Sequence, residues 1–322
     1  MHILIVSQYF WPENFRINDI SRLLIEQGNK VTVLTGKPNY PDGKFYPGYG
    51  LFKKFREKYQ GADVIRIPLF PRGDGGGLRL ILNYLSFMFF GCLLFPFFKI
   101  PKYDVIFVYE PSPITVAIPA ILLKKIRKVP LFFYVLDLWP ESLSAVDAIR
   151  SKSILKLVAK VVNYIYRNCD RILVPSKGFI SNIQQYNVDL SKIIYWPQWG
   201  EEIFNLNEKN GSQIEKLPAG FKIIFAGNIG AAQGLDIVID AAVVLRKYSD
   251  ISWIIVGDGR MKSSFDEQIY KNNLQNTIIM LGRKPLEMMP DYFSLADCLL
   301  VTLKHDPIFS LTLPAKIQTY LA

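Results

Sequence analysis

Cysteine and histidine are scarce in this 322-residue chain, and their scarcity excludes several kinds of site. The three cysteines, Cys92, Cys169 and Cys298, are far apart and odd in number, so they build neither a disulfide framework nor a cysteine-based zinc site. The two histidines, His2 and His305, are too few for most metallohydrolase designs. We therefore expect a protein of the reducing cytosol whose chemistry depends on carboxylates, backbone amides and cations.

Charge is neither abundant nor evenly placed. Charged residues make up 20% of the chain and apolar residues 50%, which excludes a disordered chain, and the length predicts two domains. Residues 1–200 carry 26 Lys and Arg against 14 Asp and Glu, whereas residues 201–322 carry 12 against 14. A basic N-terminal half suits nucleic acid, an anionic bilayer or a phosphorylated substrate. Because no nucleic-acid-binding motif accompanies it, we expect no nucleic acid partner.

Long apolar runs are also few. The N-terminal run MHILIVSQYF has no cationic segment before it and no cleavage site after it, so we expect a strand and not a signal peptide. Residues 79–100 contain a second run that is interrupted by Asn83 near one end and Pro96 near the other. This length is marginal for a spanning helix. The run is compatible with a buried helix, an interfacial membrane helix or, least favoured, a true span.

Short apolar runs alternate with stretches of helical periodicity along the chain. The helical stretch 18–27 stops at Gly28, a typical C-cap residue, and the stretch 113–128 ends in a basic last turn. The strand-like runs of the N-terminal half are HILIVS, KVTVLT, DVIRIP, YDVIFVYE, PLFFYVLD and DRILVPS. Such strands, apolar on both faces and alternating with helices, predict parallel βαβ units and a doubly wound α/β sheet.

A polar, irregular stretch interrupts this alternation near residue 200. We therefore expect an N-terminal domain over residues 1–200, a linker over 201–220 and a second Rossmann-like domain over 221–322. The strands of the second domain are FKIIFAG, SWIIVGDG, NTIIMLG and CLLVTLK. Because Ala322 falls within a helical pattern without a closing strand, we expect this second domain to be incomplete.

Glycine-rich turns follow two of these strands. FAGNIGAAQGLD, residues 225–236, places three glycines around a strand-to-helix turn, where backbone N–H groups can face an anion. VGDGRMKS, residues 256–263, is a second glycine turn. Neither has the spacing of the dinucleotide fingerprint, so NAD is not favoured, and either turn alone could simply connect a strand to a helix.

The ordered set of motifs is more specific than any one of them. GNIGAAQGLD, IIVGDG, IIMLGRKPLEMMPDYF, ADCLLVTLK and LPAKIQTYLA resemble the donor-binding domain of family 4 glycosyltransferases with the GT-B fold. YFWPENFRIND, GKPNYPDGKFYPGY, FVYEPSP and VLDLWPESL resemble bacterial O-antigen and capsule transferases, including those that add N-acetyl-L-fucosamine. The resemblance implies two Rossmann-like doubly wound domains that face a cleft.

The resemblance also implies an activity. It is the retaining transfer of an N-acetylated sugar from a UDP-sugar to an undecaprenyl-diphosphate-linked saccharide, without a metal or other cofactor, by a cytoplasmic enzyme peripheral on the inner leaflet of the cell membrane. Two alternatives remain open, a nucleotide-sugar epimerase of the same fold and a non-catalytic, membrane-docked subunit.

The donor-binding residues of the family match this chain unevenly. The family commonly has arginine and lysine where this chain has Asn228 and Gln233, and glutamate where it has Leu311 and Thr319. The resemblance therefore predicts a diphosphate site that lacks two cations, for which Lys316 and Arg283 can supply charge instead. The donor-binding candidates are Gly227, Asn228, Gly230, Gln233, Gly257, Arg283, Thr312, Lys316 and Thr319. A solvated helix residue is the alternative for Lys316, and an exposed loop charge the alternative for Arg283.

Three residues of the N-terminal half are catalytic candidates. Asp137 follows an apolar strand and Glu110 ends another, so both carboxylates are expected at the carboxyl edge of the sheet, where doubly wound folds bind ligands. The resemblance makes Arg16 a ligand for a phosphate or the acceptor. The alternatives are a helix N-cap for Asp137, an edge-of-sheet charge for Glu110 and a surface pair with Asp19 for Arg16.

A basic cluster precedes the apolar run. KKFREK, residues 53–58, together with Arg72, Arg79 and the apolar run 79–100, predicts a surface that presses on anionic lipid. A solvated charged face is the simpler interpretation of the cluster alone.

Overall fold

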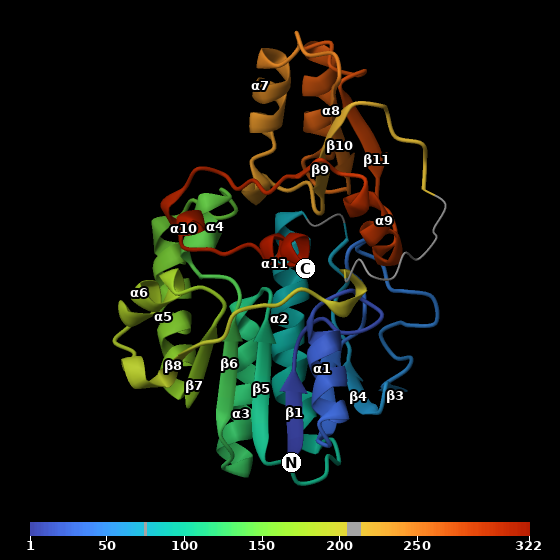
Figure 1. Ribbon diagram of the computed structural model, residues 1–322. Coiled ribbons are helices and arrows are strands. Elements are labelled where there is room, and N and C mark those ends of the chain that lie inside the picture. Colours follow the sequence, from blue (N-terminus) through green and yellow to red (C-terminus); the bar gives the residue numbers. More distant parts are fainter. Residues whose placement is uncertain (74–75, 205–213) are drawn as a thin grey trace. The chain divides into compact units, whose positions relative to one another are not determined.

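The computed structural model describes residues 1–73, 76–204 and 214–322 (Figure 1). The chain divides into two compact units, Met1–Pro197 and Gln198–Ala322. Part of the expected linker, residues 205–213, lies outside the described residues. Both units are parallel α/β structures, as the alternation of apolar runs and helical stretches predicts.

The N-terminal unit is built on an eight-stranded sheet with the order β3-β4-β2-β1-β5-β6-β7-β8. Its pairs are parallel except for the antiparallel pair β3 and β4 at one edge. The strands are β1 (His2–Val6), β2 (Lys30–Gly36), β3 (Arg56–Tyr59), β4 (Ala62–Ile67), β5 (Val105–Glu110), β6 (Leu131–Val135), β7 (Arg171–Val174) and β8 (Ile193–Tyr195). Every residue of the central strand β1 is buried, because neighbouring strands and helices on both faces enclose it.

Helices cover both faces of this sheet. They are α1 (Ile17–Glu26), α2 (Gly77–Leu94), η1 (Phe95–Phe97), η2 (Ile114–Val116), α3 (Ala117–Arg127), α4 (Glu141–Ala145), α5 (Lys152–Asn168), α6 (Gly178–Gln184) and η3 (Leu190–Lys192). From β1 the chain leads through α1 toward one edge of the sheet, and from β5 through α3 toward the other. Right-handed crossovers therefore put α1 and α3 on opposite faces. Helix α3 contacts both α2 and α5, so these three helices form one layer.

The C-terminal unit has a four-stranded parallel sheet with the order β11-β10-β9-β12. Its strands are β9 (Phe221–Ala226), β10 (Ile251–Val256), β11 (Ile278–Gly282) and β12 (Cys298–Leu299). Its helices are η4 (Glu202–Phe204), η5 (Ala231–Gln233), α7 (Asp236–Val244), α8 (Lys262–Lys271), η6 (Leu286–Met288), α9 (Met289–Ser294), α10 (Pro307–Ser310) and α11 (Ala315–Leu321). Two apolar cores, one centred on Phe225 and Ile255 and the other on Ile224 and Tyr292, fix the strands of this sheet between them.

Candidate functional site

Three strands of the C-terminal unit lead into glycines that pack backbone against backbone. Gly227 follows β9, Gly257 follows β10 and Gly282 ends β11, and all three have positive φ, at 143°, 153° and 68°. The Gly227 amide donates to the Val256 carbonyl, and the Gly257 amide to the Gly282 carbonyl, both at 2.8 Å. A Cβ on Gly257 would stand 1.9 Å from the Gly227 carbonyl oxygen, so only glycine fits there. The result is an edge whose backbone a ligand can approach closely.

Lys316 on α11 lies over this edge. A Cβ on Gly227 would stand 2.8 Å from the Lys316 Nζ, and that nitrogen lies 3.5 Å from the centroid of the Phe225 ring. The position is fixed one turn later, where the Tyr320 hydroxyl accepts a hydrogen bond from the Ala226 amide at 3.1 Å. Within the described residues, the buried Nζ has no hydrogen-bond partner. Burial lowers the pKa of Lys316 to about 7, so the arrangement favours an anionic ligand that would restore full charge.

The glycine turn after β9 contains Asn228, Gly230 and Gln233. Gln233 closes this turn, because its Oε1 accepts the Gly230 amide at 3.2 Å. Asn228 is exposed, and its carboxamide packs against Gly230 and Gly259. Both side chains therefore shape the turn without bringing charge, and the cation at this edge comes from Lys316 instead.

A carboxylate that the sequence analysis did not identify lies beside Thr319. The Thr319 hydroxyl contacts the Glu201 Oε2 at 3.2 Å and the Ala315 carbonyl at 3.2 Å. Glu201 thus stands next to the position where the resemblance predicts a glutamate. Glu201 lies in an irregular polar stretch far from α11 in the chain, so no sequence pattern identifies it as a site residue.

The two remaining donor candidates are Thr312 and Arg283. The Thr312 hydroxyl donates to the Ile308 carbonyl at 3.5 Å, in the turn after α10. Arg283 is exposed and directly follows Gly282, and the next residue, Lys284, pairs with Glu215. The structure thus brings Gly227 into contact with both Gly257 and Lys316, and Arg283 and Thr312 lie in loops, Arg283 directly after Gly282 and Thr312 before α11.

Two carboxyl groups meet at the carboxyl edge of the N-terminal sheet. Glu110 ends β5 and is fully buried, and its Oε2 accepts the amides of Leu136 and Asp137 at 3.2 and 3.3 Å. Asp137 follows β6, is half-buried, and accepts the Trp139 indole N–H at 3.3 Å. Burial raises the pKa of both carboxyls, and the neighbouring Asp137 raises the pKa of Glu110 further. Asp137 is the more accessible carboxyl of the pair, whereas the fully buried Glu110 can act only through the loop that it holds.

Aromatic side chains lie next to Asp137, and a cation lies next to these aromatic side chains. Tyr84 of α2 packs against Trp139 with ring centroids 6.3 Å apart, and its hydroxyl hydrogen-bonds with Tyr9. The Arg72 guanidinium lies 4.8 Å from the centroid of the Tyr40 ring, and its charge opposes the rise that burial causes in the pKa of Tyr84. Tyr84 lies within the apolar run, and only its hydroxyl group distinguishes it from its neighbours, so the sequence does not identify it as a site residue. Arg72 is expected from the sequence at a lipid-facing surface and not at this edge.

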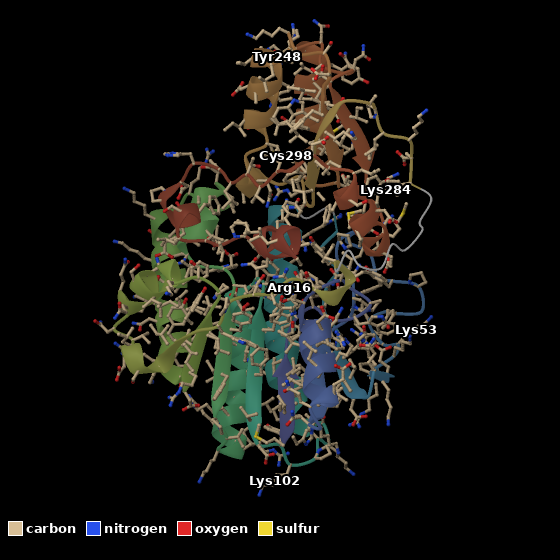
Figure 2. All side chains as sticks on the ribbon, viewed as in Figure 1. Arg16, Lys53, Lys102, Tyr248, Lys284 and Cys298 are labelled. Atoms are coloured by element: carbon tan, nitrogen blue, oxygen red, sulfur yellow. The ribbon has the colours of Figure 1, made fainter. Side chains whose placement is uncertain are left out.

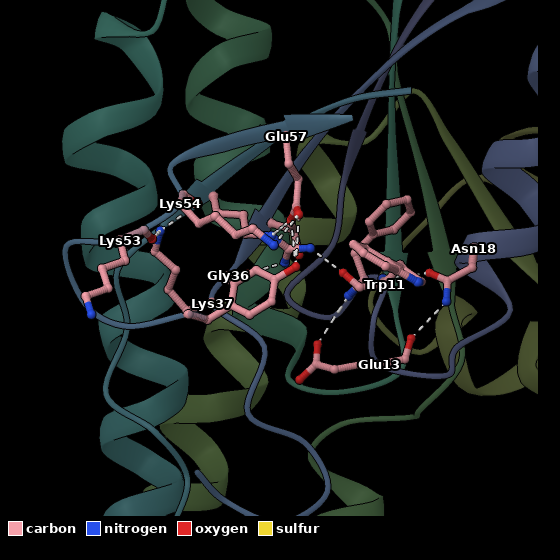
Figure 3. Close-up of polar contacts among 12 residues, drawn as sticks. Trp11, Glu13, Asn18, Gly36, Lys37, Lys53, Lys54 and Glu57 are labelled. Atoms are coloured by element: carbon pink, nitrogen blue, oxygen red, sulfur yellow. Dashed lines mark hydrogen bonds and ion pairs between the residues drawn. The ribbon is translucent and has the colours of Figure 1, made fainter. Parts of the chain in front are cut away.

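Buried polar contacts hold the loops at this edge (Figure 3). The Glu13 carboxylate accepts the amides of Asn39, Tyr40 and Phe10 at 2.8, 2.7 and 3.3 Å, and burial raises the pKa of Glu13 to about 7. The Lys37 ammonium donates to the carbonyls of Lys53 and Lys54.

Arg66 is the second buried cation of this network. Its guanidinium donates to Glu57, to the Gly36 carbonyl and to the Trp11 carbonyl. Arg16 lies at the start of α1, directly after the loop that Glu13 anchors (Figure 2). The network therefore fixes the loops that carry Arg16 and Arg72.

Acidic, histidine and cysteine side chains do not cluster as metal ligands do. Over residues 1–73, 76–204 and 214–322, no group of three or more of them is placed to hold a metal ion.

Comparison with protein families gives two matches. Residues 15–199, more than half of the chain, match the model for Glycosyltransferase Family 4, and residues 208–309 match the model for Glycosyl transferases group 1. A relative in Escherichia coli K12, named "Putative colanic acid biosynthesis glycosyl transferase WcaI", is 25% identical over all of this chain and 81% of its own length.

Solved structures show a similar fold. The lipopolysaccharide glycosyltransferase WaaG has a TM-score of 0.60 at 13% identity, over 95% of this chain and 76% of WaaG. Anabaena HepE in complex with UDP and glucose has a TM-score of 0.60 at 18% identity, over 94% of this chain and 74% of HepE. These likenesses confirm the predicted GT-B fold with its two Rossmann-like domains.

Proposed function

The chain belongs to glycosyltransferase family 4, and we propose that it is a retaining, metal-independent hexosyltransferase. Its donor is a UDP-linked N-acetylated sugar, with N-acetyl-L-fucosamine as the candidate that the motifs favour. Its acceptor is an undecaprenyl-diphosphate-linked saccharide of bacterial O-antigen or capsule assembly, on the cytoplasmic face of the membrane. The name of WcaI, which refers to colanic acid, and the UDP bound by HepE support this assignment.

The observation that carries the proposal is the buried Nζ of Lys316 over Gly227, which has no hydrogen-bond partner in the part of the chain that the structure describes. A diphosphate could approach the backbone of the glycine edge closely and would receive hydrogen bonds from one ammonium and not from the Gly227 and Gly257 amides, because those amides already donate to neighbouring carbonyls. Because the ammonium is already desolvated, its interaction with an anion is stronger than at the surface. Lys316 thus stands in for the two cations that Asn228 and Gln233 do not supply.

The ribose of the donor would lie near Thr319. In the family a glutamate on this helix commonly contacts the ribose. Here the Glu201 carboxylate, 3.2 Å from the Thr319 hydroxyl, offers the acceptor oxygens that two ribose hydroxyls need. Arg283 and Thr312 complete the contacts that we assign to the nucleotide and its phosphates.

The chemical step needs positioned charge and little else from the protein. The acceptor hydroxyl oxygen forms a bond to the anomeric carbon while the bond from that carbon to the phosphate oxygen breaks, and the hydroxyl proton passes to the departing phosphate on the same face. Lys316 stabilises the charge that grows on that phosphate. Asp137 orients the acceptor, and Glu110 positions Asp137 by holding its backbone amide. Arg16 and Arg72 lie in loops at the same edge of the sheet and would contact the acceptor diphosphate.

A transfer assay tests this function and its two alternatives. The chain is incubated with a tritiated UDP-N-acetyl sugar and a bacterial lipid extract, beside Lys316→Met and, as a matched control, Lys271→Met in the last turn of α8. We expect label in the lipid fraction with the wild type and the control, and a large loss with Lys316→Met. Release of a free epimer supports the epimerase, and the absence of any product supports the non-catalytic subunit; either result contradicts the proposal.

A further inference from the structure

Helix α2 places polar residues inside and apolar residues outside. Its buried side chains include Asn83 and Ser86. The Gln8 side-chain amide donates to Asn83 Oδ1 at 2.7 Å, and Ser86 Oγ accepts a hydrogen bond from the Phe70 backbone amide at 3.0 Å. These buried contacts account for the polar residues that interrupt the apolar run in the sequence.

The outward side of α2 is a continuous apolar stripe. Its members are between 44% and 73% exposed and recur every three or four residues, so they share one side of the helix. We call the following six residues the α2 stripe: Leu78, Ile81, Leu82, Leu85, Phe89 and Leu93. The stripe is about 22 Å long at the rise of an α-helix, and Phe97 of η1, which is 81% exposed, follows it in the chain. Such a surface is typical of an interaction site.

The helices of the same layer, α2, α3 and α5, carry positive charge and no acidic residue. The cations of this layer are Arg79, Lys124, Lys125, Arg127, Lys152, Lys156, Lys160 and Arg167. By contrast, α1 on the opposite face carries Asp19 and Glu26, and α7 carries Asp236 and Asp240. The absence of acid is therefore a property of this layer and not of helices throughout the chain.

Further cations border the end of α2. Lys99 and Lys102 are exposed just after η1, and Arg56 of β3 donates to the Lys99 carbonyl at 3.4 Å. In Figure 2 the side chain of Lys102 projects from the surface of this unit. Lys124 pairs with Asp170 at 2.6 Å. The exposed cations include Lys125 and Arg127 of α3, the lysines of α5, and Lys99 and Lys102.

We infer that the layer of α2, α3 and α5 docks on the surface of an anionic lipid bilayer. The α2 stripe enters the boundary between headgroups and acyl chains, with the helix parallel to the membrane plane, while the lysines of α5 and of residues 99–102 meet anionic headgroups. The inference rests on the proposed function only in placing the enzyme at a membrane, and vesicle binding requires no sugar transfer.

Two other arrangements fit the contacts less well. A transmembrane α2 would have to leave the unit, which would expose Asn83 and Ser86 and uncover Gly36, where a Cβ would stand 3.4 Å from Phe87 of α2. A second copy of the chain on the same face would bring two acid-free, lysine-bearing layers together, and like charges oppose such an association. In an anionic bilayer, acyl chains can cover the apolar stripe and anionic headgroups can pair with the cations of the layer.

Vesicle flotation tests the inference with the whole chain. We expect binding to vesicles of phosphatidylglycerol and phosphatidylcholine, weaker binding to pure phosphatidylcholine, and loss of the charge-dependent part at high salt. The double variant Leu85→Glu/Phe89→Glu should weaken binding at least about tenfold. Val244→Glu in α7, where the side chain is 75% exposed, is the matched control and should bind like the wild type.

Two further variants keep the test independent of folding. Lys156→Glu/Lys160→Glu changes only exposed lysines and should weaken binding to anionic vesicles while leaving the thermal midpoint unchanged. Phe89→Trp should show blue-shifted emission that brominated lipids quench. The inference is overturned if the stripe variant and the lysine variant bind anionic vesicles as the wild type does, if no binding occurs, or if the stripe is covered in a dimer that does not bind vesicles.

Discussion

Removing the Lys316 ammonium should weaken UDP binding and abolish its dependence on pH above neutrality. A hydrogen bond to a charged group is worth about 1.5–3 kcal/mol, which corresponds to a rise in Kd of about tenfold to about 150-fold in Lys316→Met. The burial that lowers the pKa of Lys316 to about 7 sets the pH range. Since the anion binds the protonated form, free protein must take up a proton above pH 7 before it binds.

The direction of the effect follows from that linkage. At pH 9, two units above the pKa, only about 1% of the free protein carries the ammonium. The Kd of the wild type for UDP should therefore rise about tenfold per pH unit above 7, until the pH reaches the pKa of Lys316 in the complex. Lys316→Met should show no such rise.

Isothermal titration calorimetry with UDP at pH 7, 8 and 9 measures both effects. Lys271→Met, which removes a lysine from the last turn of α8, controls for the change in net charge and should behave like the wild type. The reasoning is refuted if Lys316→Met binds UDP as tightly as the wild type at pH 7, or if the affinity of the wild type is constant between pH 7 and pH 9.

Four further predictions concern stability and turnover. Gly257→Ala should lower the free energy of unfolding by more than about 2 kcal/mol, because its Cβ would stand 1.9 Å from the Gly227 carbonyl oxygen. Gly282 has a positive φ but open space around it, so Gly282→Ala should lower the free energy of unfolding by only about 1 kcal/mol. Equal losses for the two variants in urea denaturation would contradict this. Asp137→Asn should reduce sugar transfer about 100-fold with UDP affinity unchanged, and a matching loss of UDP affinity would count against its role toward the acceptor. The pKa of Glu13 is raised from 4.5 to about 7, so the free energy of unfolding of the wild type should fall by about 3 kcal/mol between pH 4.5 and pH 7. Glu13→Gln should remove this fall, as measured by urea denaturation at pH 5 and pH 8. If the variant shows the same dependence on pH as the wild type, the prediction is refuted. EDTA should leave transfer unchanged, whereas loss of activity that Mg²⁺ restores would disprove metal independence.

The sequence predicted all four strands of the C-terminal sheet and the six inner strands of the N-terminal sheet, but not the two edge strands of the N-terminal sheet. Strands such as β1 and β10 are continuous apolar runs because both faces are buried. Strand β3 is REKY, which we interpreted as part of a charged cluster, and it sits at the edge of the sheet, where polar side chains are tolerated. Strand β8, at the other edge, has only three residues and fell just before the expected linker.

The candidate site was predictable only where topology determines it. Glu110 and Asp137 follow neighbouring parallel strands, so their proximity could be expected from the sequence. The contact of Lys316 with Gly227, and that of Glu201 with Thr319, join residues far apart in the chain. Such contacts depend on where α11 packs, which helical periodicity does not reveal. For the same reason, the polar residues of α2 could not be assigned to its buried side before Gln8 and Phe70 were placed against them.

The most direct measurement is the titration of Lys316 itself. In protein labelled with ¹³C at the lysine side chains, the Cε resonance of Lys316, assigned by its absence in Lys316→Met, reports the protonation of Nζ. We predict a midpoint at about pH 7 in the free protein and one at least about one unit higher with saturating UDP. A midpoint near 10.5 in the free protein, or one that UDP does not move, would contradict a donor site built on this lysine.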